Sequence, residues 1–488
     1  MSVTEFDVAA QEVALGEEVL FSPSRRSDSN QLSSIPAEIY LEIIGYIKPI
    51  ENEPFPRSFT AKAKQLKQRR NDLRSLSCVC RFLRILTIPI LFESMEFIVR
   101  SVENDTSFFA SLSRNEDLAV ALALHVNELH IAPGKPAVRE SADLVSSYSA
   151  AFSWLPHLRR LQIWKTPLVS ILLSSPSITS LILRAVDFNA ITSDMVHQAA
   201  SQLKLQTFEL YGQAPEDPSV TAAFLPLVTN VTELRTDMWI FMENIISSGI
   251  IPPLEILDVR VAKPDLFFCF LYQLAALKSL TFTSDIDEVS ISEHMLSLPR
   301  LHSLRQLTCP PRSITWLHGE HNLSSLSFSW YFHPSELRSS LPPSTPSLWT
   351  RIDHYRSLSE LEIPYLFAID IKPDPRRHLT RLKKLSLIFI MNLRIDETDT
   401  LYNHIAKLST IWGSDSLREL HWQFIGFSHR HVMSETDSIP AYCTKKEHFR
   451  ALFGCRSLGP RDSELMFMIS GEVRRGYGSE WMRITWGI

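Results

Sequence analysis

The sequence predicts an α/β protein in which a small all-helical unit precedes a curved solenoid of short repeats, with a parallel sheet on the concave face. Apolar residues recur at helical spacing between residues 35 and 86, and a hexad that reads as the end of a short strand recurs from residue 126 onward. A chain of 488 residues exceeds what one compact core usually holds. We therefore expect a flexible tail (1–30), the helical unit (31–95), the solenoid (96–440) and a C-terminal cap (441–488).

The helical unit opens with a clear helix signal over residues 35–47. Ile39, Ile43 and Ile47 recur at four-residue steps, so they share one face of a helix. Pro36 suits the first helical turn, where its missing N–H costs nothing. The preceding stretch ends in SPSRRSDSN, a polar composition that is typical of a flexible tail.

A second helix is expected over residues 73–86, with Pro89 ending it. Its apolar face would carry Leu76, Val79, Cys80, Leu83 and Leu86. Between the two helices, residues 48–71 contain prolines and then a basic, helical-looking run, which we interpret as a solvated helix face, with a nuclear-import or acid-binding patch as the alternative. So small a unit is marginally stable alone, and we expect a partner to cover part of its apolar surface.

The repeat is a hexad of the form apolar-x-x-Leu-x-apolar, in which only Phe208 replaces the fourth-position Leu. Successive hexads begin 19 to 35 residues apart, close to the ~20–29 residues of a leucine-rich repeat unit. The twelve hexads are VNELHI (126–131), LRRLQI (158–163), ITSLIL (178–183), LQTFEL (205–210), VTELRT (231–236), LEILDV (254–259), LKSLTF (277–282), LRQLTC (304–309), LSSLSF (323–328), LSELEI (358–363), LKKLSL (382–387) and LRELHW (417–422).

Each Leu-x-apolar end predicts a short strand whose alternate side chains point inward. One such strand cannot bury its apolar edge alone, so neighbouring repeats would stack and share a core. The residue between the inward pair should face the concave surface, and in chain order these residues are His130, Gln162, Ile182, Glu209, Arg235, Asp258, Thr281, Thr308, Ser327, Glu362, Ser386 and His421. Their charges are mixed, so a protein or peptide partner is favoured over a phosphate backbone.

Composition narrows the classes of function. The net charge of −5 argues against a dedicated nucleic-acid binder, and no apolar run reaches the ~20 residues that span a membrane. The acidic N-terminus lacks the basic start and apolar block of a secretory signal. A cytoplasmic or nuclear location with reduced thiols is expected.

No motif in the sequence indicates catalysis, a cofactor or a metal. Cys78 and Cys80 both lie in the expected helix, and Cys80 is on its apolar face. We therefore expect Cys80 to be a buried thiol and not a metal ligand. The histidine pairs at 318/321 and 429/431 lack a second pair of ligands at a recognisable spacing. We therefore expect no enzymatic activity and no cofactor.

The segments LSSIPAEIYLEIIGYI (32–47) and LRSLSCVCRFLRILTIPILF (73–92) resemble the F-box family in their Pro-x-Glu-Ile opening, Val-Cys-Arg core and Pro-x-Leu-Phe close. The resemblance implies docking on a Skp-family adaptor and, through it, on a cullin. Carried over position by position, it implies that the contacts come from Ile35, Pro36, Ile39, Ile43, Leu76, Val79, Cys80 and Leu83.

The repeats are similar to the degenerate leucine-rich repeats that follow the F-box in many fungal F-box proteins. That pairing implies a substrate-recognition adaptor of a Skp–cullin–F-box ubiquitin ligase that binds an unknown protein substrate. The candidate substrate face would be Glu209, Arg235, Asp258, Thr281, Thr308, Ser327, Glu362 and His421. Three alternatives remain: a scaffold without ligase function, a helical unit that only caps the solenoid, and an enzyme with an unrecognised site after residue 440.

Overall fold

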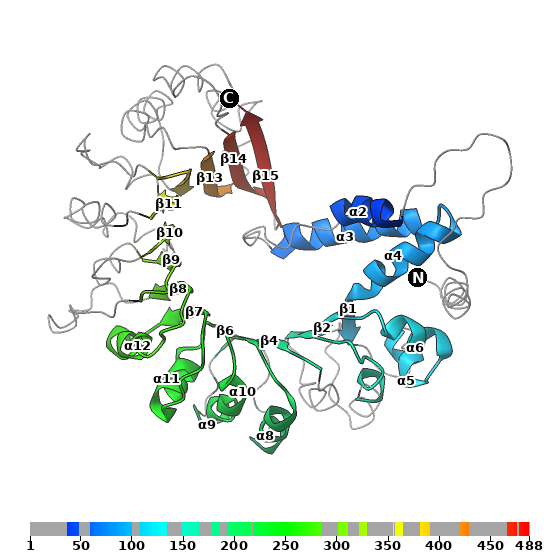
Figure 1. Ribbon diagram of the computed structural model, residues 1–488, viewed down its shortest axis with the longest axis horizontal. Coiled ribbons are helices and arrows are strands. Elements are labelled where there is room, and N and C mark those ends of the chain that lie inside the picture. Colours follow the sequence, from blue (N-terminus) through cyan, green and yellow to red (C-terminus); the bar gives the residue numbers. More distant parts are fainter. Residues whose placement is uncertain are drawn as a thin grey trace. The chain divides into compact units, whose positions relative to one another are not determined.

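The computed structural model combines helices and strands (Figure 1). It describes residues 37–47, 59–99, 108–133, 149–164, 177–185, 193–213, 215, 218–284, 301–310, 322–328, 355, 357–364, 381–390, 419–428, 466–475 and 478–487. The expected flexible tail (1–30) and two of the expected adaptor contacts, Ile35 and Pro36, lie outside these residues.

The chain divides into two compact units. The first comprises Met1–Pro54 and Lys62–Pro253, and the second comprises Phe55–Ala61 and Leu254–Ile488. The boundary that the sequence suggested near residue 95 lies inside the first unit. Each unit is described by itself below.

Three helices open the chain: α2 (Ala37–Ile47), α3 (Phe59–Ser77) and α4 (Arg81–Glu93). Helix α2 confirms the first helix expected from the sequence. The single helix expected over 73–86 is wrong, because the chain turns at Cys78 and Val79, whose amides donate to the carbonyls of Ser75 and Leu76.

Pro89 does not end the second helix, since α4 continues to Glu93. Proline removes one intrahelical hydrogen bond, and a helix can tolerate this loss where packing holds the turn. Leu86, Ile88 and Phe92 on either side of it are buried, and this packing stabilises α4 across the proline.

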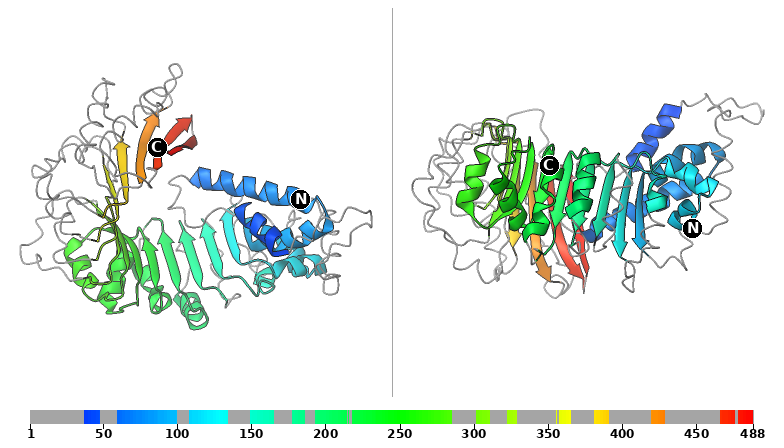
Figure 2. Two further views of the ribbon diagram at one scale, coloured as in Figure 1. Left: turned by 45° about the horizontal axis from the view of Figure 1, so that its top comes forward. Right: turned by 90° about the horizontal axis from the view of Figure 1, so that it is seen from below.

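The described residues of the first unit form six parallel strands, each paired with the next in chain order (Figures 1 and 2). They are β1 (Ser94–Val99), β2 (Glu128–Pro133), β3 (Arg160–Trp164), β4 (Ser180–Arg184), β5 (Thr207–Tyr211) and β6 (Glu233–Thr236). Strand β1 was not expected, although its alternating Met95 and Phe97 are the signal that could have revealed it.

Short helices lie between several of these strands in the described residues, which is the usual consequence of parallel pairing. They are α5 (Phe108–Ser113), α6 (Asp117–Ala123), α8 (Ser193–Gln202), α9 (Pro218–Ala222), α10 (Leu225–Val228) and, after β6, α11 (Trp239–Ser248). Gly249 ends α11 in the left-handed conformation, with φ of 70°.

The apolar hexad positions form the core of the first unit. Leu161, Leu181, Phe208 and Leu234 are paired across β3–β6 and are fully buried. Phe208, the exception to the Leu rule, keeps the register, and its ring lies 5.8 Å from that of Phe241 between ring centroids. At this repeat a fully buried aromatic ring from the strand packs against a ring of the neighbouring helix.

Where the structure describes the second unit, it has eight parallel strands and a final antiparallel one. They are β7 (Ile256–Val261), β8 (Ser279–Ser284), β9 (Gln306–Cys309), β10 (Ser325–Phe328), β11 (Glu360–Pro364), β12 (Lys384–Ile390), β13 (Glu419–Ser428), β14 (Met466–Arg475) and β15 (Gly478–Gly487). Helix α12 (Pro264–Leu271) connects β7 to β8. Strands β14 and β15 lie in the segment expected to be a cap.

One backbone hydrogen-bond pattern recurs at the start of the strands in both units. A single carbonyl accepts from two successive amides of the next repeat: Arg159 O accepts from Thr179 and Ser180 N, both at 2.9 Å. Ser324 O accepts in the same way from Ser359 and Glu360 N, also at 2.9 Å. The hexads thus repeat in backbone geometry as well as in sequence.

The parallel sheet and all twelve hexad strands are confirmed. Among the helices of the described residues, none is both long and apolar enough to cross a membrane.

Candidate functional site

The first candidate site comprises four exposed apolar side chains, on α2 and in the turn after α3, which we call the helical patch and define as Ile39, Leu41, Ile43 and Val79. Ile39 is 43% exposed, Ile43 54% and Val79 67%. Ile39 and Ile43 lie one turn apart on the same face of α2, and large apolar side chains left in water at such positions indicate a binding surface. Leu41, 45% exposed, was missed because it falls outside the four-residue spacing of the isoleucines.

The helices that carry the helical patch have a small core of their own. Ile44, Leu73 and Leu86 are buried together, one from each helix. The rings of Tyr40 and Phe82 pack edge to face with centroids 5.1 Å apart. The side of α2 that carries Tyr40 and Ile44 therefore packs against α3 and α4, and this packing leaves Ile39 and Ile43 exposed to solvent.

The other residues expected to contact the adaptor, Leu76, Cys80 and Leu83, lie close to the turn between α3 and α4. Leu76 is half-buried against the small core, and Leu83 is half-buried as well. Cys80 is the N-cap of α4, and its Sγ accepts a hydrogen bond from Leu83 N at 3.5 Å. The expectation of a buried Cys80 thiol is wrong: Cys80 and Cys78 are exposed, because the chain leaves the helix at this point.

The second candidate site is the outward face of the sheet. The residues that alternate with the buried leucines form in-register rows, so that Gln162, Ile182, Glu209 and Arg235 are neighbours across β3–β6. His130 pairs with Gln162 and is half-buried. The sequence predicted an open face here, and this prediction is wrong at three strand centres: Gln162 is 9% exposed, Ile182 1% and Glu209 4%.

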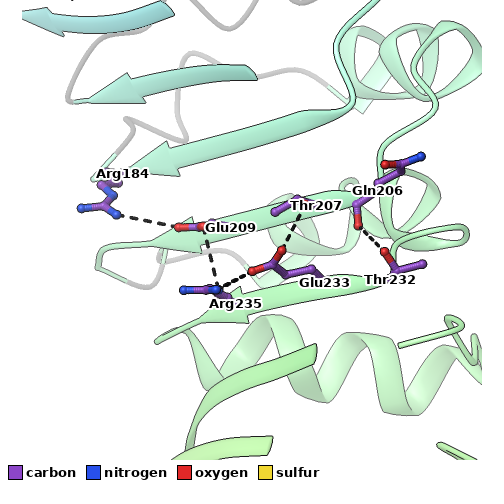
Figure 3. A network of polar contacts seen from close by, with 7 residues as sticks. All are labelled: Arg184, Gln206, Thr207, Glu209, Thr232, Glu233 and Arg235. Atoms are coloured by element: carbon purple, nitrogen blue, oxygen red, sulfur yellow. Dashed lines mark hydrogen bonds and ion pairs between the residues drawn. The ribbon is translucent and has the colours of Figure 1, made fainter. Parts of the chain in front are cut away.

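Glu209 is buried because two arginines lie against its carboxylate (Figure 3). Arg184 Nη2 is 3.7 Å from Glu209 Oε2, and Arg235 Nε is 4.0 Å from Glu209 Oε1. Arg235 Nε also donates to Glu233 Oε1 at 2.8 Å, and Thr207 Oγ1 donates to Glu233 Oε2 at 3.3 Å. Acidic and basic side chains therefore form one connected network across three strands.

The network holds Arg235 in its charged form. Burial alone would lower the pKa of Arg235, but Glu233 and then Glu209 more than offset it, and the pKa is raised. A fixed positive charge keeps Glu209 paired although it is out of water. A buried carboxylate without such partners would cost several kcal/mol.

In the second unit the corresponding row is Asp258, Thr281, Thr308, Ser327, Glu362 and Ser386. Most of these residues are half-buried, and Ser386 is buried. Ser327 Oγ donates to Glu362 Oε1 at 2.9 Å. His421 pairs with Ser386 in the ladder, but its side chain lies outside the described residues. The structure thus places most of the predicted substrate face in register, with hydroxyls between two acidic residues.

Within the described part of the chain, no group of three or more His, Cys, Asp or Glu side chains can hold a metal ion. No family model matches this chain, and no curated protein matches it.

Proposed function

We propose that this chain is the substrate-recognition adaptor of a Skp–cullin–F-box ubiquitin ligase. The observation that carries the proposal is the helical patch: Ile39, Ile43 and Val79 remain in water on helices that already have their own core. Burying such side chains in a partner's groove contributes about 1.5–3 kcal/mol each.

The helical arrangement supports a helix-in-groove mode of docking. The patch residues come from α2 and from the turn that precedes α4, and Ile44, Leu73 and Leu86 fix these elements to each other. A preformed surface binds with a smaller loss of conformational entropy than one that must order on binding.

The strands would form a leucine-rich-repeat solenoid that carries the substrate. Support comes from the twelve hexad strands and from the backbone hydrogen bonds that recur at the start of most of them. Neighbour-to-neighbour stacking of this kind is how repeat proteins build long binding faces.

In this proposal the chain contributes proximity and no chemistry. The helical patch holds the ligase at one site, the sheet face holds the substrate at another, and the effective concentration of substrate lysines near the ubiquitin donor rises. Ubiquitin transfer belongs to other subunits.

Binding of the full chain to an immobilised Skp-family adaptor tests the proposal. We expect wild type to bind, and Ile43→Asp or Val79→Asp to weaken binding by at least about tenfold, because each would bury an unpaired carboxylate in the interface. Ile251→Asp is the matched control: Ile251 is also 54% exposed in the first unit but lies far from the patch in sequence.

Failure of wild type to bind the adaptor would overturn the ligase role and favour the alternative, a scaffold without ligase function. Equal binding by wild type and both patch variants would show that another surface docks the adaptor.

A further inference from the structure

Three side chains at the ends of adjacent strands in the first unit form a row that the motifs did not single out. Trp164, Arg184 and Tyr211 are the last residues of β3, β4 and β5, and they are paired in register. Their positions alternate with the buried core residues, so they lie on the outward face with Glu209. We call this row the Trp-Arg-Tyr row.

The composition of the row is that of a binding surface. Trp, Tyr and Arg are the residues that most often dominate binding energy at interfaces. Trp164 is 37% exposed and the side chain of Arg184 is 33% exposed. The row therefore offers an aromatic surface and a cation to solvent side by side.

The Arg184 guanidinium is positioned by its neighbours. Its Cζ lies 5.2 Å from the centroid of the Tyr211 ring, within range of a cation–π contact. Glu209 contacts it from the buried side, at 3.7 Å. Figure 3 shows Arg184 at the edge of the network, whereas Arg235 lies between two carboxylates. Of these two arginines, Arg184 is the one placed to meet a ligand.

The backbone under the row is also fixed. Directly after Arg184, Ala185 has φ of 49°, and its N–H donates to Tyr211 O. Directly after Tyr211, Gly212 has φ of 143°, and its N–H donates to Asp237 Oδ1 at 3.0 Å. A Cβ on Gly212 would come within 2.9 Å of Ala185 Cα, so the two strand ends meet too closely for any side chain there. Gly212 adopts a positive φ without strain, whereas Ala185 has a Cβ and is strained there, and such strain often collects at binding sites.

We propose that the Trp-Arg-Tyr row binds an extended, acidic peptide segment, with Arg184 pairing to an Asp or Glu carboxylate and the aromatic rings packing on an adjacent apolar residue. This proposal rests on the proposed function, since it specifies the chemistry of the substrate segment. Strands lie about 4.8 Å apart, and an extended peptide advances about 3.3 Å per residue, so the acidic and apolar residues should be one to three positions apart.

The charge of the site favours a carboxylate over a phosphate. A phosphorylated side chain carries nearly two negative charges and is usually held by an arginine cluster. Here Arg184 is partly neutralised by Glu209, and Arg235 is already bound by Glu233. One partly compensated guanidinium suits a single negative charge.

Selection from a random peptide library displayed on phage, using the full-length chain as target, tests the proposal. We expect the selected peptides to share an Asp or Glu within three positions of an aromatic or aliphatic residue. Their synthetic versions should bind Arg184→Gln and Trp164→Ala at least about tenfold more weakly than wild type. Replacing the peptide's acidic residue by its amide should cause a similar loss, and replacing it by phosphoserine should not improve binding.

Two variants serve as matched controls. Trp154→Ala removes a tryptophan of similar exposure (38%) in the same unit, and Arg114→Gln removes an exposed arginine that also has a glutamate partner. Both should bind the peptides like wild type. Selected peptides without an acidic residue, failure to select any peptide, or equal binding by Arg184→Gln and wild type would each overturn the proposal.

The same variants separate this inference from the ligase role. Arg184→Gln should keep full affinity for the Skp-family adaptor, and Ile43→Asp should keep full affinity for the peptides. Loss of peptide binding alone therefore tests the substrate chemistry, whereas loss of adaptor binding alone tests the proposed function.

Discussion

The opening helices and the strand ladder of the first unit treat apolar side chains in opposite ways. The fourth-position residues of the hexads from Leu129 to Leu234 are fully buried, whereas Ile39, Ile43 and Val79 remain in water. The difference teaches that stacked repeats bury their apolar side chains against one another. A small unit of helices has too few neighbouring elements to cover all of its apolar side chains.

The largest expected effect contrasts the two regions directly. Phe208→Ala should lower the free energy of unfolding by about 3–5 kcal/mol, because it opens a cavity among fully buried rings. Ile43→Ala should change it by less than about 0.5 kcal/mol, because that side chain is already hydrated. Urea unfolding followed by circular dichroism measures both. A similar loss in the two variants would contradict the contrast.

Replacing a glycine in each region by alanine compares how tightly the backbone is packed there. Gly212→Ala should cost about 1–3 kcal/mol, since φ of 143° and a backbone atom at 2.9 Å leave no room for a methyl group. Gly45→Ala in α2 meets nothing within 4 Å and should stabilise the helix by about 0.5–1 kcal/mol. Thermal unfolding of both variants gives the two signs. A neutral Gly212→Ala would show that the strand ends can move apart.

Breaking the polar network should lower the free energy of unfolding by less than a core cavity does, but by more than the loss of a surface ion pair. Glu209→Gln leaves Arg184 and Arg235 without their shared carboxylate and should cost about 1–3 kcal/mol. Glu128→Gln is the control, because its pair with Arg160 is more exposed, and it should cost at most about 1 kcal/mol. Equal urea midpoints for the two variants would mean that burial adds nothing to the network.

The smallest expected effect is a dependence on pH. Burial, and then the charge of His157, lower the pKa of His125 below its usual 6.5. As the pH falls below 6.5, the unfolded chain therefore binds more protons at His125 than the folded chain does. His125 leaves the free energy of unfolding unchanged above pH 6.5 and lowers it as the pH falls further. The loss in urea midpoint between about pH 7.5 and about pH 5.5 should be smaller in His125→Gln than in wild type.

Much of the fold could be predicted from the sequence because its signals are local. The Leu-x-apolar ends fixed strand positions and register, so that even Phe208 aligned with Leu181 and Leu234. The break at Cys78 and Val79 could not be predicted, since the apolar spacing continues through the turn. The prediction that Pro89 ends the helix failed because packing around Leu86 and Phe92 keeps the helix intact.

The candidate site was less predictable because it depends on side chains brought together by pairing. Glu209 is a strand-centre residue in the sequence, and only Arg184 and Arg235 on the neighbouring strands explain its burial. Trp164, Arg184 and Tyr211 occupy no motif and become one row through the register alone. A search for aromatic and basic residues directly after each hexad is the signal that could have found them.

Thiol alkylation in the presence and absence of a Skp-family adaptor tests the central claim most directly. Cys78 and Cys80 flank Val79 and are exposed, Cys269 is exposed in the second unit, and Cys309 is buried, with burial raising the pKa of its thiol. The account predicts that the adaptor slows alkylation of Cys78 and Cys80 at least about tenfold, leaves Cys269 at its free rate, and finds Cys309 unreactive throughout. Unchanged alkylation of Cys78 and Cys80 at saturating adaptor would contradict it.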